Sequence, residues 1–259
     1  MTKLNVRWRL ARRTFRAVLA GAIGALVLGG SHVGAVSIGD SEVEATRGSN
    51  PNPELFPPQS HPYGFGMDTW AENWWRWLMA IPAAQNPFLS ESADCNVNQS
   101  GPVFYIPPFA LGSQNHTRSC TIGHGKALAF SLSTVLNDYP CPDPTFQPAP
   151  GQSLFDFLLA GAVAGNADIA EIDVTVDGQP QNDLLAYHFA SNDLMFFKGD
   201  LSLQSSLDAC ITGGFQPAAV DAFLIIVKPL PPGHHTITRR VVTTTGRITG
   251  PNTTEIDVL

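Results

Sequence analysis

Residues 95–132 constrain the fold of this chain more than any other stretch. Two apolar runs lie there, at 103–106 and 127–132, and each follows a glycine-bearing turn. Short apolar runs bounded by such breakers are typical of buried strands. Cys95 precedes the first run and Cys120 the second. We therefore expect a disulfide between these cysteines to fasten the two strands at one end.

All four cysteines, at positions 95, 120, 141 and 210, lie well inside the chain. An even number of cysteines in an exported protein implies two disulfides, and four cysteines allow three pairings. We expect Cys95–Cys120 and Cys141–Cys210, because this pairing closes the most local loop first. No C-x-x-C motif occurs, which disfavours a structural zinc site, and we assign no metal ligands.

Residues 1–35 are typical of a targeting signal. They hold six of the 15 basic residues of the chain and no acidic residue, and they include an uncharged run rich in Ala and Gly at 17–30. That run is shorter than a membrane-spanning helix requires, and the small residues at 33–35 are suitable for cleavage by a signal peptidase. Arg12-Arg13 resembles a twin-arginine signal, with an ordinary secretory signal as the alternative. We expect export to the periplasm or the cell exterior.

Removal of this signal leaves a strongly acidic chain. Nine basic and 22 acidic residues remain, a formal charge of −13. Such a surface repels phosphate backbones and anionic lipid, so nucleic acid is excluded as a partner. No later segment is long and apolar enough to span a membrane.

A proline-rich polar arm and a tryptophan-rich helix begin the mature chain. Residues 36–67 show no periodic apolar pattern and are predicted to form a tether or an extended arm on the domain. Residues 68–82 predict a helix capped by Thr69 and Glu72, with Glu72 and Arg76 paired one turn apart. Its apolar face is expected to be buried against a sheet and consists of Trp70, Trp74, Trp77 and Leu78.

The rest of the chain predicts mainly strands. Five prolines make 133–152 a long loop, and 153–164 is a second helix, apolar all round and therefore expected to be buried. Asp177-Gly178 predicts a hairpin turn. The expected strands are 171–176, a return strand at 184–190, a central strand at 222–227, and closing strands at 234–245 and 254–259. Residues 193–216 are expected to be irregular. We predict that 68–259 form one antiparallel β-sandwich of jelly-roll type with two packed helices.

Signatures of known catalytic machinery are missing from the sequence. There is no G-x-S-x-G, H-E-x-x-H, Walker loop or G-x-G-x-x-G. His234 and His235 are adjacent, but neighbours on a strand point to opposite faces, which argues against a shared metal. The sequence leaves open a metal site assembled from residues on distant strands, and we assign no cofactor.

Several motifs together resemble a family of uncharacterised exported bacterial proteins. The resemblance covers most of 70–240 and implies an exported domain, without implying an activity. The chain departs from the family pattern at 122–124 and at Ser131. The motifs that carry the resemblance are Trp74 to Trp77, Ala80-Ile81-Pro82 with Asn86-Pro87, Cys95, Gln99 to Val103, Arg118 to Phe130, Val176 to Gly178, and Leu230 to Ile237.

Two classes of function therefore remain. The first, which we favour, is non-catalytic binding of a glycan, a small ligand or a surface partner, because aromatic residues are plentiful and catalytic signatures are missing. Its candidate residues are Trp75, Tyr105 and Tyr139. The second is a hydrolase or metal-dependent enzyme whose site is assembled across strands. Its candidate residues are His124, Lys126, Asp143 and His188. Lys126 is the most unusual, because it is a charge at the start of an apolar strand face.

Overall fold

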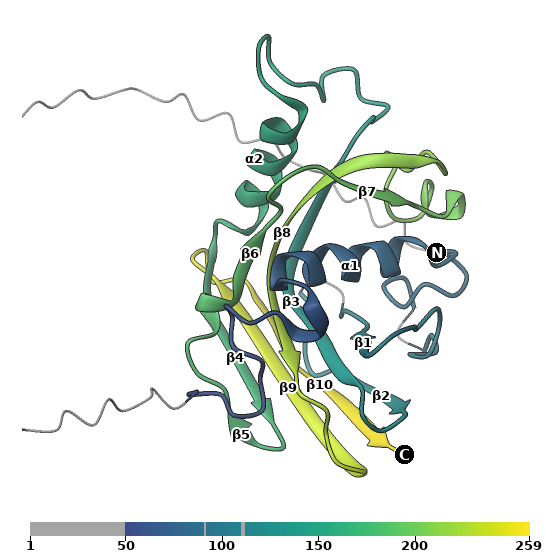
Figure 1. Ribbon diagram of the computed structural model, residues 1–259. Helices are drawn as coiled ribbons and strands as arrows, with labels where there is room; N and C mark the ends of the chain where they lie inside the picture. The colour runs from purple at the N-terminus through teal and green to yellow at the C-terminus, as the bar shows by residue number, and fades with distance from the viewer. Residues whose placement is uncertain (1–49, 91, 110–111) are drawn as a thin grey trace, which may run out of the picture. The chain divides into compact units, whose positions relative to one another are not determined.

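The computed structural model describes residues 50–90, 92–109 and 112–259, so the expected targeting signal and the start of the arm lie outside the described residues. The described chain is mainly β, with two five-stranded sheets packed against each other and two α-helices (Figure 1). This confirms the predicted β-sandwich with two helices. The helices are α1 (Met67–Met79) and α2 (Leu154–Asn166).

Sheet A takes its strands from residues 103–138 and from the segment after α2. Its order is β1 (Val103–Ile106), β3 (Ala127–Asp138), β8 (Phe215–Val227) and β6 (His188–Ala190), and β7 (Met195–Lys198) also pairs with β8. Sheet B has the order β2 (Thr117–Ile122), β10 (Ile248–Val258), β9 (Gly233–Thr243), β4 (Ile169–Val176) and β5 (Gln179–Pro180).

Both sheets are mixed. Most pairings are antiparallel, but β1 pairs with β3 and β2 with β10 in parallel. The path of the chain explains the first of these, because it leaves sheet A after β1, contributes β2 to sheet B and returns as β3. Parallel neighbours need such a crossover, since a tight turn reverses the strand direction.

Two strands are longer than the sequence indicated. β8 is the central strand that the apolar run at 222–227 predicted, but it begins at Phe215 and spans 13 residues. β3 continues to Asp138, so the prediction of a loop from residue 133 is wrong for its first six residues. β3 pairs with β8 along this length, and the pairing register shifts once, between Ser131 and Ser133. The chain turns away only where its prolines begin, at Pro140.

Helix α1 buries its tryptophans as predicted, but its start differs. Trp70, Trp74 and Trp77 are all at most 5% exposed. Gly66 occupies the N-cap position without a side-chain cap, so the predicted capping box is wrong. The side chain of Asp68 instead accepts a hydrogen bond from the backbone of Thr69. In Figure 1, β7 and β8 curve over α1.

Helix α2 is only half buried. Ser153 caps it by accepting a 3.0 Å hydrogen bond from the Asp156 amide. Leu158, Ala162 and Asn166 are buried, while Val163 is 39% exposed, so the expectation of an entirely buried helix is wrong. Alanine and glycine cost little when exposed, so an apolar composition does not require full burial.

Short strands replace two of the predicted elements. The Asp177-Gly178 turn leads into β5, which has only two residues, so the return strand predicted at 184–190 is wrong. A 3-10 helix, η2 (Leu184–Tyr187), comes first, and β6 then joins sheet A. The segment predicted to be irregular at 193–216 contains β7 and the start of β8.

Both predicted disulfides are present, Cys95–Cys120 and Cys141–Cys210. Cys120 lies within β2 of sheet B, whereas Cys95 lies ahead of β1 of sheet A. The first bridge therefore joins the connection ahead of β1 to β2 of sheet B. The expectation that it fastens two neighbouring strands at one end is wrong. In the described ranges, neither helix is long and apolar enough to cross a bilayer.

Candidate functional site

A buried carboxylate orients a half-exposed imidazole on sheet A. Nε2 of His188, on β6, lies 2.8 and 2.9 Å from the two carboxylate oxygens of Asp221, on β8. The side chain of His188 is 43% exposed and that of Asp221 1%. The ring also stacks on Phe223, with centroids 4.3 Å apart. Because an ionised carboxylate only accepts, Nε2 carries a proton and a neutral ring offers Nδ1 as an acceptor.

The Asp221 carboxylate is further held by the last residue of α2. Nδ2 of Asn166 donates to Oδ1 of Asp221 and to its backbone carbonyl oxygen, both at 2.8 Å. Ser133 donates in turn to the Asn166 side-chain oxygen at 2.8 Å. A buried carboxylate is costly unless it is hydrogen-bonded, so this network stabilises the charge and fixes the ring of His188.

Two glycines of α2 allow this network to form. A Cβ at Gly165 would lie 2.7 Å from Cγ2 of Val135, and one at Gly161 would lie 2.0 Å from Nδ2 of Asn137. Small residues let the helix approach β3 closely enough for Asn166 to reach Asp221. Sequence reasoning missed Ser133, Asn166 and Asp221. The one feature of the sequence that could have indicated the network is Asp221 itself, because it is a charged residue within the mostly apolar sequence of β8.

The other candidate catalytic residues lie elsewhere. His124 is exposed, and Nζ of Lys126 donates to the carbonyl oxygen of Gly101, with both residues lying just ahead of the paired strands β3 and β1. Lys126 also lines a shallow hollow beside β1. Asp143 is exposed, and hydrogen bonds from Thr145 hold the pKa of its carboxyl below the usual value.

These residues do not form one site. Lys126 and Asp143 flank the two ends of β3, which has 12 residues. A strand of that length spans roughly 40 Å. His188 lies beside the middle of β8, opposite Phe223. Of the predicted catalytic candidates, only His188 is therefore built into a polar network.

Two of the three candidate binding aromatics belong to the packing between α1 and sheet A. Nε1 of half-buried Trp75 donates to Oγ1 of Thr134 at 2.7 Å. Tyr105 is 9% exposed and stacks on Trp77 at 5.6 Å, and burial raises the pKa of its phenol to about 12. Neither ring is a surface platform.

The third candidate, Tyr139, lies beside an exposed apolar surface. Its backbone N–H donates to the Pro217 carbonyl oxygen at 3.0 Å, directly after the end of β3. Pro217 pairs with Phe196 of β7, and Phe215 pairs with Lys198. Because side chains alternate along a strand, these positions share one face of the sheet. We call this surface the outer aromatic face, and it comprises Tyr139, Phe196, Lys198, Phe215 and Pro217.

The outer aromatic face is exposed to an unusual degree. Phe215 is 80% and Phe196 53% exposed, while the alternate residues of β7, Met195 and Phe197, are each 2% exposed on the opposite side. Sequence reasoning missed this face. The run Met195–Lys198 has apolar residues at both parities of the strand, so its pattern did not distinguish an exposed phenylalanine from a buried one.

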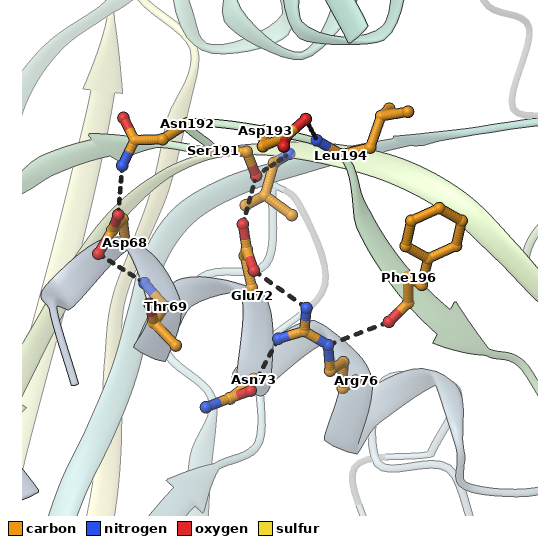
Figure 2. Close-up of polar contacts among 11 residues, drawn as sticks. Asp68, Thr69, Glu72, Asn73, Arg76, Ser191, Asn192, Asp193, Leu194 and Phe196 are labelled. Carbon is orange, nitrogen blue, oxygen red and sulfur yellow. Dashed lines mark hydrogen bonds and ion pairs between the residues drawn. The ribbon is translucent and has the colours of Figure 1, made fainter. Parts of the chain in front are cut away.

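Polar contacts of α1 hold the strand that carries Phe196 (Figure 2). Glu72 accepts a hydrogen bond from Ser191 at 2.9 Å and pairs with Arg76 at 3.0 Å. Arg76 also donates through Nε to the backbone oxygen of Phe196 at 3.1 Å. The helix therefore fixes the β6–β7 connection and the backbone of β7, which keeps the outer aromatic face in place.

No protein-family model, curated protein or solved structure matches this chain. Any function must therefore be argued from the geometry of the outer aromatic face and of the His188–Asp221 network.

Proposed function

We propose that this protein is an exported, non-catalytic domain that binds a surface partner through its outer aromatic face. The exposure of Phe215 and Phe196 on adjoining strands is the observation that supports this proposal. Contiguous exposed apolar side chains usually belong to interaction sites, because their exposure otherwise costs free energy. Export is supported by the two disulfides, by the basic, leader-like residues at the start of the sequence and by the resemblance to exported proteins.

The chemistry of the face favours a protein partner over a small ligand. A small molecule is normally held in a concave pocket, whereas this face lies on the outside of two paired strands. Lys198, which pairs with Phe215 and lies two residues from Phe196, adds a positive charge to the face, so the best fit is an apolar surface with an acidic rim. A glycan stacked on the rings is the competing ligand class, with Tyr139 supplying a hydroxyl.

The test compares the binding of labelled protein to cell-envelope preparations of the native host. Phe196→Ser with Phe215→Ser should weaken binding by about tenfold or more, since buried aromatic anchors contribute at least 1.4 kcal/mol or so. Leu185→Ser is the matched control, because Leu185 is 48% exposed on η2 and outside the face. Unchanged binding of the double variant contradicts the proposal.

Pretreatment of the envelope separates the two partner classes. Protease treatment should abolish binding if the partner is a protein. Enzymatic removal of glycans should leave binding intact. Loss of binding only after glycan removal would transfer the proposal to a glycan ligand.

The second candidate function is a hydrolase or metal-dependent enzyme that uses His188. It is favoured by the half-exposed imidazole held by buried Asp221, an arrangement suited to general acid–base chemistry. In that case, ester or glycoside hydrolysis should fall by about a hundredfold in His188→Gln. Exposed His61 provides the control substitution His61→Gln. Stoichiometric metal in protein purified from its native compartment would also contradict the binding-only proposal.

A further inference from the structure

A buried carboxyl group lies against the Cys141–Cys210 disulfide. Asp138, the last residue of β3, is 3% exposed. One of its carboxylate oxygens and both cysteine Sγ atoms lie within 4.8 Å of one another. The Sγ of Cys141 is also 3.6 Å from the backbone carbonyl oxygen of Asp138. This contact is separate from both sites considered above.

The surroundings of Asp138 favour its protonated form. Burial raises the pKa of this carboxyl to about 8, and the charge of Asp208 together with a hydrogen bond to it adds to the effect. Nε2 of Gln216 donates to Oδ2 of Asp138 and opposes the rise only in part. The strand β7 contributes apolar side chains, Met195 and Phe197, to this face. At neutral pH, Asp138 is therefore protonated, and its carboxyl group has an oxygen within 4.8 Å of both sulfurs.

The disulfide can be reached from solvent. Cys141 and Cys210 are both partly exposed, and their neighbours Pro142 and Ala209 are exposed. The other bridge differs, since Cys95 and Cys120 are each only 3% exposed. Thiol–disulfide exchange requires a thiolate to approach a sulfur atom, so the two bridges should differ in reactivity.

We propose that Cys141–Cys210 is a thiol–disulfide exchange site for an extracytoplasmic dithiol, and that Asp138 protonates the leaving cysteine sulfur. A thiolate of the dithiol attacks one Sγ, the S–S bond breaks, and a mixed disulfide forms. The other Sγ leaves as a thiolate and takes the proton of Asp138.

The Asp138 carboxylate then accepts the proton of the second thiol of the dithiol. The resulting thiolate displaces the cysteine from the mixed disulfide, and the released sulfur takes a proton from water. In total, two electrons and two protons pass from the dithiol to the cysteine pair. The dithiol becomes a disulfide, Asp138 returns to its protonated form, and the loop at 141–152 loses its covalent link to Cys210.

The experiment uses the folded full chain with dithiothreitol as the dithiol. Samples are alkylated at intervals, and the thiols are located by peptide mass. Cys141–Cys210 should be reduced about tenfold or more faster than Cys95–Cys120, which serves as the internal control. After division by the thiolate fraction of dithiothreitol, the rate should fall as the pH rises through about 8, where Asp138 loses its proton.

Two variants separate proton donation from accessibility. Asp138→Asn should slow the reduction of Cys141–Cys210 about tenfold at pH 7 and remove the inflection from the pH profile. Asp183→Asn removes the same charge at an exposed position whose positive φ of 51° asparagine tolerates, and it should change nothing. Equal reduction rates for the two bridges, or a wild-type profile without the inflection, overturns the proposal. These wild-type measurements decide the matter even if Asp138→Asn does not fold.

Discussion

Nδ1 of His235 lies 2.7 Å from Oδ2 of Asp177, and Nε2 of the same ring lies 2.9 Å from the carbonyl oxygen of Pro231. Both partners only accept hydrogen bonds, so both ring nitrogens donate and the imidazole is protonated. Burial lowers the pKa of His235, but the hydrogen bonds to Asp177 and Pro231 outweigh it and raise the pKa above its usual value. A charge-assisted contact therefore joins the turn after β4 to the start of β9.

Asp177→Asn should lower the pKa of His235 and destabilise the protein. The raised pKa stabilises the fold fully below the ordinary histidine pKa, and this contribution is lost as the pH rises through the folded-state value. The expected loss of unfolding free energy at pH 5 is about 1 kcal/mol, because Asp177 is 43% exposed and partly screened. Histidine NMR titration and urea unfolding at pH 5 and 9 measure both effects.

The neighbouring His234–Asp257 pair provides the control for this prediction. The side chains of His234 and Asp257 are each 57% exposed, and Nδ1 of His234 lies 2.9 Å from Oδ1 of Asp257. Asp257→Asn should change the unfolding free energy by less than about 0.5 kcal/mol. A loss for Asp257→Asn as large as that for Asp177→Asn would refute the assignment of a special role to His235.

Asp138 should make the stability of the protein fall as the pH rises. Its folded-state pKa of about 8 lies above the ordinary aspartate value, so the native state binds the proton more tightly than the unfolded state. The resulting stabilisation is complete below about pH 4 and is lost progressively up to about pH 8. The slope should approach but not exceed about 1.4 kcal/mol per pH unit.

Asp138→Asn removes this titration. Urea unfolding between pH 5 and 9 should show a flatter stability profile for the variant, while Asp183→Asn should retain the wild-type profile. Identical slopes in all three proteins would mean that Asp138 does not titrate in this range.

Local patterns identified the parts of the fold that depend on local sequence. The tryptophans of α1 recur at helical spacing, and their burial followed from that spacing. The run at 222–227 is apolar at both parities, as a strand covered on both faces must be. The disulfide pairing followed from proximity in the sequence. Each of these conclusions needed no knowledge of distant partners.

Non-local pairing determined what the sequence did not reveal. β6 has three residues and exists because it pairs with β8, so no local pattern marks it. Asn166 became part of a polar network only because α2 ends beside Asp221. Whether Phe215 is exposed likewise depends on which distant segments pack over it, and in the structure it is 80% exposed. The sequence alone does not distinguish an exposed phenylalanine from a buried one.

The hydroxyl oxygen of Thr134 should be needed as the hydrogen-bond acceptor for the indole Nε1–H of Trp75. Thr134→Val leaves the Nε1–H without its 2.7 Å acceptor in a half-buried position. The expected cost is about 1 to 2 kcal/mol of unfolding free energy, whereas Thr134→Ser keeps a hydroxyl and should cost less. A double-mutant cycle with Trp75→Phe isolates the contact, and a coupling energy near zero would show that water replaces it.

Asp221→Asn should disrupt the network that holds His188. Oδ1 of Asp221 accepts from both His188 and Asn166, and Oδ2 accepts from His188 as well. An asparagine can keep its oxygen at the Oδ1 position, which both donors share, but its N–H₂ group then stands at the Oδ2 position and faces the Nε2–H of His188 donor to donor. The uncharged oxygen is also a weaker acceptor than the carboxylate. The unfolding free energy should fall by about 2 to 3 kcal/mol, and NMR should show the ring of His188 released from its single orientation.

The exposed Asp173 is the matched control for Asp221. Its carboxylate pairs with Arg240 at 2.7 Å on the solvent side of sheet B and is 53% exposed. Asp173→Asn removes the same charge and should cost less than about 0.5 kcal/mol, because exposed ion pairs contribute little. Equal losses for the two variants would show that the burial of Asp221 adds nothing. A His188 ring that keeps its single orientation in Asp221→Asn would show that its stacking on Phe223 is sufficient to position it.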